Sequence, residues 1–116
     1  MAELGRVDKT DPLIWYKELV RYALDSGSAP GFSGRRDDLA QAVLTKTQIQ
    51  KLAALDEEAL IYVLDLDWLD PELTQDDDSQ PIQKWWWHLG KIRAKIYPAE
   101  VLPEHLRAVY LEAEKT

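Results

Sequence analysis

Three consecutive tryptophans between basic residues are the part of this chain best suited to binding chemistry. They form the centre of the segment IQKWWWHLGK, residues 82–91. At about 100° per residue, a helix through this segment turns Trp85 and Trp86 to one apolar stripe and Trp87 to the far side. Burial of an indole removes on the order of 150–250 Å² of surface from water. A fully exposed Trp87 would therefore lack the large favourable free energy of that burial. The spacing therefore predicts that something covers Trp87.

Two interpretations of Trp87 stay open at this point. In the first, another element of the same chain covers the ring, and the small residues Gly90 and Ala94 let that element approach closely. In the second, Trp87 is an anchor for a partner, because tryptophan is enriched among binding hot spots. The second interpretation predicts a partner-binding surface in which basic side chains surround the anchor: Trp87, Lys84, Lys91, Arg93 and Lys95.

The charged residues fall into two blocks of opposite sign. Residues 52–83 hold ten acidic side chains and no lysine or arginine, whereas residues 84–97 hold four basic side chains and no acid. Either the two blocks face each other within the fold, or they face partners of opposite charge. In the second case we expect the acidic block to bind a partner, or a second copy, through Asp65 and Asp67.

The residue types that perform catalysis or hold metals form no readable set. His88 and His105 lack a second histidine at ligand spacing, and we interpret both as structural, with His88 on the partly exposed flank of its helix. The aspartates lack the glycine and the terminal glutamate of a calcium loop. No G-x-S-x-G elbow occurs, and residues 31–36, GFSGRR, lack the ending of a phosphate-binding loop. The sequence therefore predicts no catalytic residue, metal, cofactor or small-molecule substrate.

Composition narrows the class of protein further. The 116 residues carry a formal net charge of −7 and no cysteine. General nucleic-acid binding uses an excess of basic residues, so the acidic balance argues against it. A chain without cysteine has no disulfide or thiolate chemistry and fits a reducing compartment. No run approaches the roughly 18 apolar residues of a membrane span, and no secretory signal is visible, so we expect a cytoplasmic protein that does not enter a membrane.

We expect these residues to be positioned by one all-α domain that covers residues 1–116. The predicted architecture is a single small irregular bundle of five to six helices. Residues 1–10 are predicted to be a loosely ordered arm, and residues 27–36 and 70–80 are predicted to be loops because they are rich in glycine, proline, serine and aspartate.

Capping residues and prolines set the predicted helix boundaries. The capping box of Thr45 with Gln48 marks one start, and Gly27 suits the left-handed residue after a helix end. The tryptophan helix is predicted over residues 81–97, and one turn is predicted before the last helix. The segment after Asp56 is the one place where a strand competes with a helix. The full set of predicted helix starts is Asp11 with Pro12, Asp37 or Asp38, Thr45, Asp56, Pro81 and Pro103.

The leading functional hypothesis is a non-enzymatic protein-interaction module: an adaptor, a regulator or a small subunit of a larger assembly. It would use the basic and aromatic helix face together with the acidic surface. The first alternative is a small helical subunit of a nucleoprotein complex that contacts RNA or DNA through the strip Lys84–Lys95. The second alternative is a small enzyme whose site assembles from residues far apart in the sequence.

Overall fold

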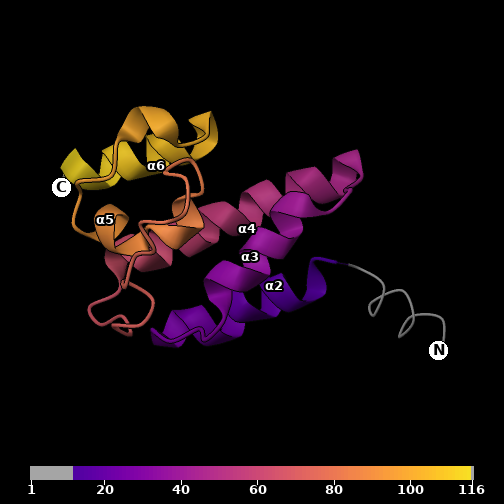
Figure 1. Cartoon of the computed structure of the whole chain (residues 1–116), viewed down its shortest axis with the longest axis horizontal. Helices are drawn as coiled ribbons and strands as arrows, with labels where there is room; N and C mark the ends of the chain where they lie inside the picture. The colour runs from indigo at the N-terminus through magenta and orange to yellow at the C-terminus, as the bar shows by residue number, and fades with distance from the viewer. Residues whose placement is uncertain (1–11, 116) are drawn as a thin grey trace.

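The predicted all-α bundle is confirmed in the computed structural model of the chain, which describes residues 12–115 and the side chains of residues 12–112. In this part of the chain the regular structure is helical, without a strand, and it comprises the α-helices α2 to α6 with shorter turns between them (Figure 1). No helix among the described residues is long and apolar enough to cross a membrane. The predicted N-terminal arm and Asp11 lie outside the described residues.

The first predicted helix forms, with an irregular second half. Helix α2 (Ile14–Glu18) continues into a π-helical turn, Leu19–Ala23, and then into a 3-10 turn, Leu24–Ser26. Gly27 ends it at φ 95°, in the left-handed conformation that was predicted. The buried face repeats at helical spacing and comprises Leu13, Tyr16, Val20 and Leu24.

The predicted loop over residues 27–36 is wrong in its second half, because helix α3 (Phe32–Gln41) begins there. Gly31 precedes α3 at φ 78°, and Phe32 and Arg36 are buried on its inner face. Asp37 therefore lies in the middle of a helix and does not cap one, and Asp38 is likewise mid-helix. Burial of Phe32 and Arg36 outweighs the low helix propensity of Gly34.

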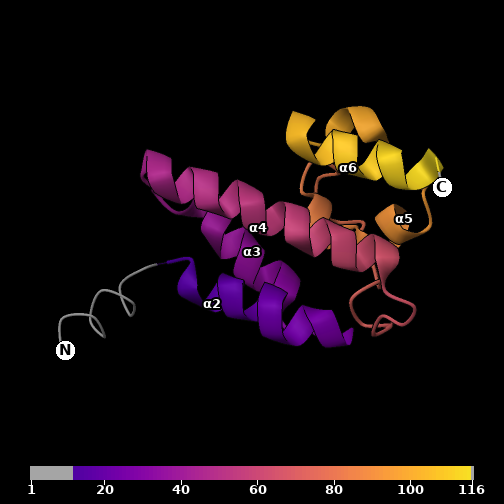
Figure 2. The ribbon, with the colours of Figure 1, turned by 180° about the vertical axis from the view of Figure 1, so that it is seen from behind.

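A single long helix, α4 (Lys46–Asp65), replaces two predicted helices. The capping box of Thr45 and Gln48 is confirmed at its start, and the competing strand does not form. The predicted helix start at Asp56 is wrong, because this residue is buried in the middle of α4. Helix α4 runs through the centre of the molecule, with α2 and α3 on one side and α6 (Glu104–Lys115) on the other (Figures 1 and 2).

A buried ion pair joins three helices at the side chain of Asp56. Both oxygens of Asp56 accept hydrogen bonds from Arg36 of α3, each at 2.9 Å, and Oδ1 also accepts one from the hydroxyl of Tyr16 at 2.6 Å. The guanidinium of Arg36 lies 4.4 Å from the ring centroid of Trp86, within cation–π distance. Burial raises the pKa of the Tyr16 hydroxyl, and its hydrogen bond to Asp56 adds to this, so the group stays protonated as a donor.

The predicted helix over residues 81–97 is also wrong, whereas the predicted loop over residues 70–80 is confirmed. A 3-10 turn, Trp85–Trp87, is followed by the short helix α5 (Leu89–Arg93), and Lys95 takes a φ of 65°. The hydroxyl of Tyr97 donates to the carbonyl of Ile82, which replaces local helical bonding with a long-range one. The predicted last turn and last helix are confirmed as Ala99–Val101 and α6.

The first prediction compares two ion pairs of the same bidentate geometry. In Arg36–Asp56 the side chains are 10% and 5% exposed, and in Arg21–Glu58 they are 44% and 36% exposed. Removal of one partner from a buried pair leaves an uncompensated charge in the core, so Asp56→Ala should lower the free energy of unfolding by about 3–5 kcal/mol. Glu58→Ala should change it little, because water screens the exposed pair. Urea unfolding followed by circular dichroism measures both, and equal effects of the two substitutions would refute this account of the core.

Candidate functional site

Trp87 is partly buried, and its own chain fixes one edge of the ring. The indole N–H groups of Trp86 and Trp87 both donate to Oδ1 of Asp37, at 3.3 and 3.2 Å. Trp85 and Trp86 are buried at 1% and 7% exposure, so the predicted contrast between two core tryptophans and a less buried third one holds. The helix from which this contrast was predicted does not form, and the contrast arises from a 3-10 turn instead.

Two of the basic side chains predicted to surround Trp87 pair with aspartates of the same chain. Lys84 pairs with Asp37 at 3.0 Å, and Lys91 pairs with Asp76 at 3.3 Å and Asp78 at 2.7 Å. Residues 81–97 do not form one helix, so the helical spacing from which a shared face was predicted for these cations does not apply.

Arg93 forms its hydrogen bonds with main-chain groups of the fold. Its guanidinium donates to the main-chain carbonyls of Val63 and Leu66, each at 2.7 Å, at the end of α4. Three cations of the predicted surface thus have partners within the chain, and Lys95 is half-buried in its left-handed turn. Partner binding by these residues stays a prediction.

The two charge blocks meet within the fold, but only in part. Lys91 is the cation of the basic block that pairs with aspartates of residues 52–83 among the described ion pairs. Asp65 and Asp67 lie exposed at the end of α4 and just beyond it, and a partner contact through them also stays a prediction. The segment from Asp70 to Asp78, which we call the acidic loop, holds five of these acids, and among them Asp70, Glu72 and Asp77 form no ion pair with another described residue.

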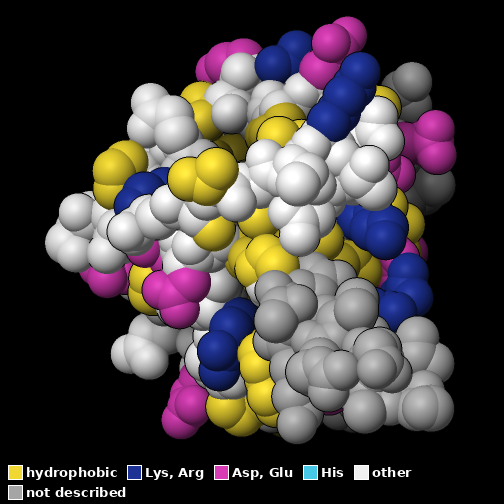
Figure 3. Space-filling model, turned by 90° about the vertical axis from the view of Figure 1, so that its right-hand side faces the viewer, with side chains coloured by type: hydrophobic (Ala, Val, Ile, Leu, Met, Phe, Trp, Pro, Cys, Tyr) yellow, Lys and Arg dark blue, Asp and Glu magenta, His cyan; other side chains and the backbone are white. Residues whose placement is uncertain are grey.

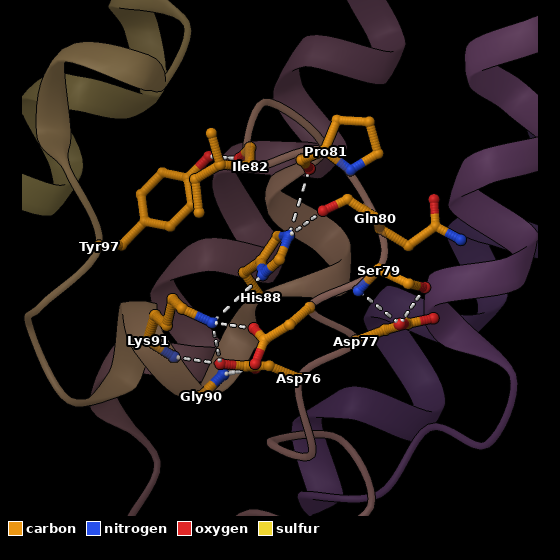
Figure 4. A network of polar contacts seen from close by, with 11 residues as sticks. Asp76, Asp77, Ser79, Gln80, Pro81, Ile82, His88, Gly90, Lys91 and Tyr97 are labelled. Atoms are coloured by element: carbon orange, nitrogen blue, oxygen red, sulfur yellow. Dashed lines mark hydrogen bonds and ion pairs between the residues drawn. The ribbon is translucent and has the colours of Figure 1, made fainter.

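His88 anchors the end of the acidic loop (Figure 4). Its Nε2 lies 3.2 Å from the carbonyl oxygens of Gln80 and Pro81, so this nitrogen carries the proton. Its Nδ1 accepts from the ammonium of Lys91 at 3.4 Å. The side chain is only 2% exposed, so the expected partly exposed flank is wrong: the imidazole N–H is used by the carbonyls of residues 80 and 81, which follow the acidic loop.

The aspartates of the acidic loop hold its own backbone in place. Asp76 accepts from the main-chain N–H groups of Gly90 at 2.7 Å and Lys91 at 3.1 Å, which satisfies the start of α5. Asp77 accepts from the N–H and the hydroxyl of Ser79. These hydrogen bonds lower the pKa of Asp77, and the ammonium of Lys91 lowers the pKa of Asp78, so both carboxyls are ionised at neutral pH.

A cavity of about 640 Å³ lies between the acidic loop and the first turn of α3, and Trp87 forms part of its wall. We call it the acidic pocket. No lysine or arginine lines it, and Gly31 and Gly34 leave its α3 side open. Five carboxylates line it: Asp70, Glu72, Asp76, Asp77 and Asp78.

The acidic pocket suits a cationic ligand that also has apolar atoms. Carboxylates attract the charge, and the indole offers a face for the carbon stem. Within the described residues, no group of three or more histidines, aspartates and glutamates is arranged to hold a metal ion. Sequence reasoning missed the role of Asp37 and Asp76, because their partners lie 14 to 50 positions away, and no local signal marks them.

No family model, no curated protein and no solved structure matches this chain. The function proposed below therefore rests on the geometry of the acidic pocket and its charges.

The second prediction concerns Asp37, whose carboxylate accepts hydrogen bonds from two indoles. Lys84 lowers the pKa of Asp37, and the two indole N–H donors lower it further. In the folded protein the pKa of Asp37 therefore lies below the usual value of about 3.9. The contribution of the Asp37 carboxylate to the free energy of unfolding is present at neutral pH and is lost as the pH falls through this folded pKa. The Nε1–H proton resonances of Trp86 and Trp87 should therefore shift together, with one midpoint below the usual pKa of an aspartate. In Asp37→Asn the shared transition should vanish; two separate midpoints in the wild type would contradict a shared acceptor.

The third prediction concerns the glycine under the acidic loop. A Cβ on Gly90 would lie 2.4 Å from the carbonyl oxygen of Thr74 and 2.9 Å from Oδ1 of Asp76, so the loop would have to move. Gly90→Ala should cost about 1–3 kcal/mol of unfolding free energy. Gly34→Ala is the matched control, because no heavy atom lies within 4 Å of its Cβ position, and it should stabilise α3 by roughly 0.5–1 kcal/mol. Urea unfolding of both variants checks the pair, and the account fails if Gly90→Ala is neutral.

Proposed function

We propose that this chain is a non-enzymatic protein-interaction module that docks a basic segment of a partner protein in the acidic pocket. One observation carries the proposal: a cavity of about 640 Å³ combines five carboxylates with the side of Trp87 and has no cation in its lining. A lysine or arginine side chain matches both features, because it joins a charged head to an apolar stem.

The charges of the pocket favour capture of such a segment. The pKa values of Asp77 and Asp78 are lowered by their hydrogen bonds and by Lys91, and the cavity wall thus carries negative charge throughout the neutral range. Carboxylates grouped in a cavity focus the field and raise the rate of encounter with a cation. Because exposed ion pairs are weak individually, we expect a modest affinity that falls with added salt.

The two alternatives have less support. Contact with RNA or DNA needs cations that are free to meet phosphates, and Lys84, Lys91 and Arg93 already bind groups of their own chain. A catalytic site needs a nucleophile beside a base. The hydroxyl of Ser33, which lines the acidic pocket, instead donates to the carbonyl of Trp86. A cytoplasmic location, which the cysteine-free composition suggested, is part of the same proposal.

The fourth prediction tests the acidic pocket with a defined probe. A short peptide rich in lysine and arginine is titrated into the ¹⁵N-labelled protein. We expect shifts that concentrate at the indole N–H of Trp87 and at the amides of Gly31 and Gly34, because these groups border the cavity. Glu72→Gln with Asp78→Asn should weaken binding roughly fivefold, since two exposed charges are removed.

The matched control keeps the same change in net charge at a different place. Asp38→Asn with Glu112→Gln removes two exposed carboxylates that do not line the acidic pocket, and it should leave the affinity nearly unchanged. A neutral peptide of equal length should not bind. Shifts spread over the whole acidic surface, or equal weakening by both double variants, would show that only net charge attracts the peptide, and the proposal would fall.

A further inference from the structure

A second cavity, of about 380 Å³, lies between α2 and α4 and has the opposite character to the acidic pocket. Leu13 and Leu55 are buried at its base, and Ile14 and Ala54 extend the apolar surface. Its charged lining residues are Lys17, Arg21 and Lys51. We call this cavity the basic groove.

The cations of the basic groove are available to a ligand. Lys17 and Lys51 are exposed and form no ion pair with any other described residue. Arg21 is held by Glu58 through two hydrogen bonds, at 3.1 and 2.9 Å. The groove thus keeps a positive balance within a chain of net charge −7, in contrast to residues 84–97, whose cations are mostly paired.

The basic groove and the acidic pocket lie toward opposite ends of the long axis of the molecule, which extends 46 Å. The start of α2 lies toward the right of Figure 1, and the acidic loop lies at its left-hand end. Figure 3 views the right-hand end and shows hydrophobic side chains between lysine and arginine side chains. One molecule therefore cannot fill its own acidic pocket with its own groove, whereas two molecules can meet end to end.

We propose that a second copy of this chain is a partner of the acidic pocket: Lys17 and Lys51 at the rim of one basic groove enter the acidic pocket of the next molecule. This inference rests on the proposed function, because it names a partner for the same site. Charge complementarity carries it. Lys17 and Lys51, which form no ion pair with another described residue, lie beside apolar side chains in the basic groove, and the charged residues that line the acidic pocket are all carboxylates.

The contact is head to tail, so each molecule keeps one free pocket and one free groove. Such a heterologous interface does not close on itself unless the rotation between copies forms a ring. The average mass should therefore rise steadily with concentration instead of stopping at a dimer. Because the contact depends on exposed charges, about 0.5 M salt should return the protein to monomers.

The fifth prediction uses two neutralised variants in sedimentation experiments. The groove variant carries Lys17→Gln and Lys51→Gln, and the pocket variant carries Glu72→Gln and Asp78→Asn. Each alone should associate at least roughly tenfold more weakly than wild type, because every copy lacks one half of the contact. An equimolar mixture should recover one intact contact and form heterodimers that do not grow further. Asp38→Asn with Glu112→Gln, two exposed acids outside both cavities, is the charge-matched control for the pocket variant and should associate like the pure wild type.

The outcomes separate this inference from the proposed function. A wild-type protein that stays monomeric at low salt overturns the inference, and a basic peptide that still binds the acidic pocket then leaves the proposed function standing. Association that persists in both neutralised variants places the interface elsewhere and also overturns it. Circular dichroism of each variant verifies folding, and the four substituted side chains are all exposed.

Discussion

The burial of one carboxylate, Asp56, is the constraint on which the arrangement of the helices depends. A charge in the core is stable only when its partners are complete, and those partners come from two other helices: Tyr16 of α2 and Arg36 of α3. The three helices must therefore meet at one register. Arg36 also lies over Trp86, so the same constraint extends from the core to the tryptophan segment and fixes where the 3-10 turn of Trp85–Trp87 sits.

Helix α3 transmits this constraint to the acidic pocket. Arg36 and Asp37 are neighbours, and a helix turns them about 100° apart, so Arg36 reaches the buried Asp56 and Asp37 reaches the indole N–H groups. The carboxylate of Asp37 holds the indoles of Trp86 and Trp87 together with Lys84. The adjacent residues Arg36 and Asp37 thus connect the wall of the acidic pocket to the buried Arg36–Asp56 ion pair. This wall is therefore in place before a partner binds. A preformed surface lowers the conformational entropy that is lost on binding.

Features with local causes could be predicted from the sequence, and features with distant causes could not. The capping box of Thr45 and Gln48 and the left-handed Gly27 involve partners within a few residues, so spacing alone reveals them. Asp56 has the composition of a helix cap, but its actual partners lie 20 and 40 positions away. The helix expected over residues 81–97 fails for the same reason, because the side chains of Asp76 and Tyr97 form hydrogen bonds with main-chain groups 14 and 15 positions away. The candidate site shares this pattern: Trp87 could be singled out from sequence, whereas the acidic pocket beside it depends on how α3 and the acidic loop meet.

The same reasoning explains why the predicted basic strip and the observed acidic pocket differ in sign. A half-buried cation loses water and needs acceptors in exchange, so Lys91 and Arg93 take carboxylates and carbonyls of their own chain as they fold. An exposed carboxylate such as that of Glu72 keeps its water and needs no such partner. The cations of residues 84–97 are therefore mostly paired, whereas much of the negative charge stays on the surface without a partner. Lys17 and Lys51 need no such partner because they are exposed. Which charges remain unpaired is thus set by burial and cannot be obtained by counting residues along the chain.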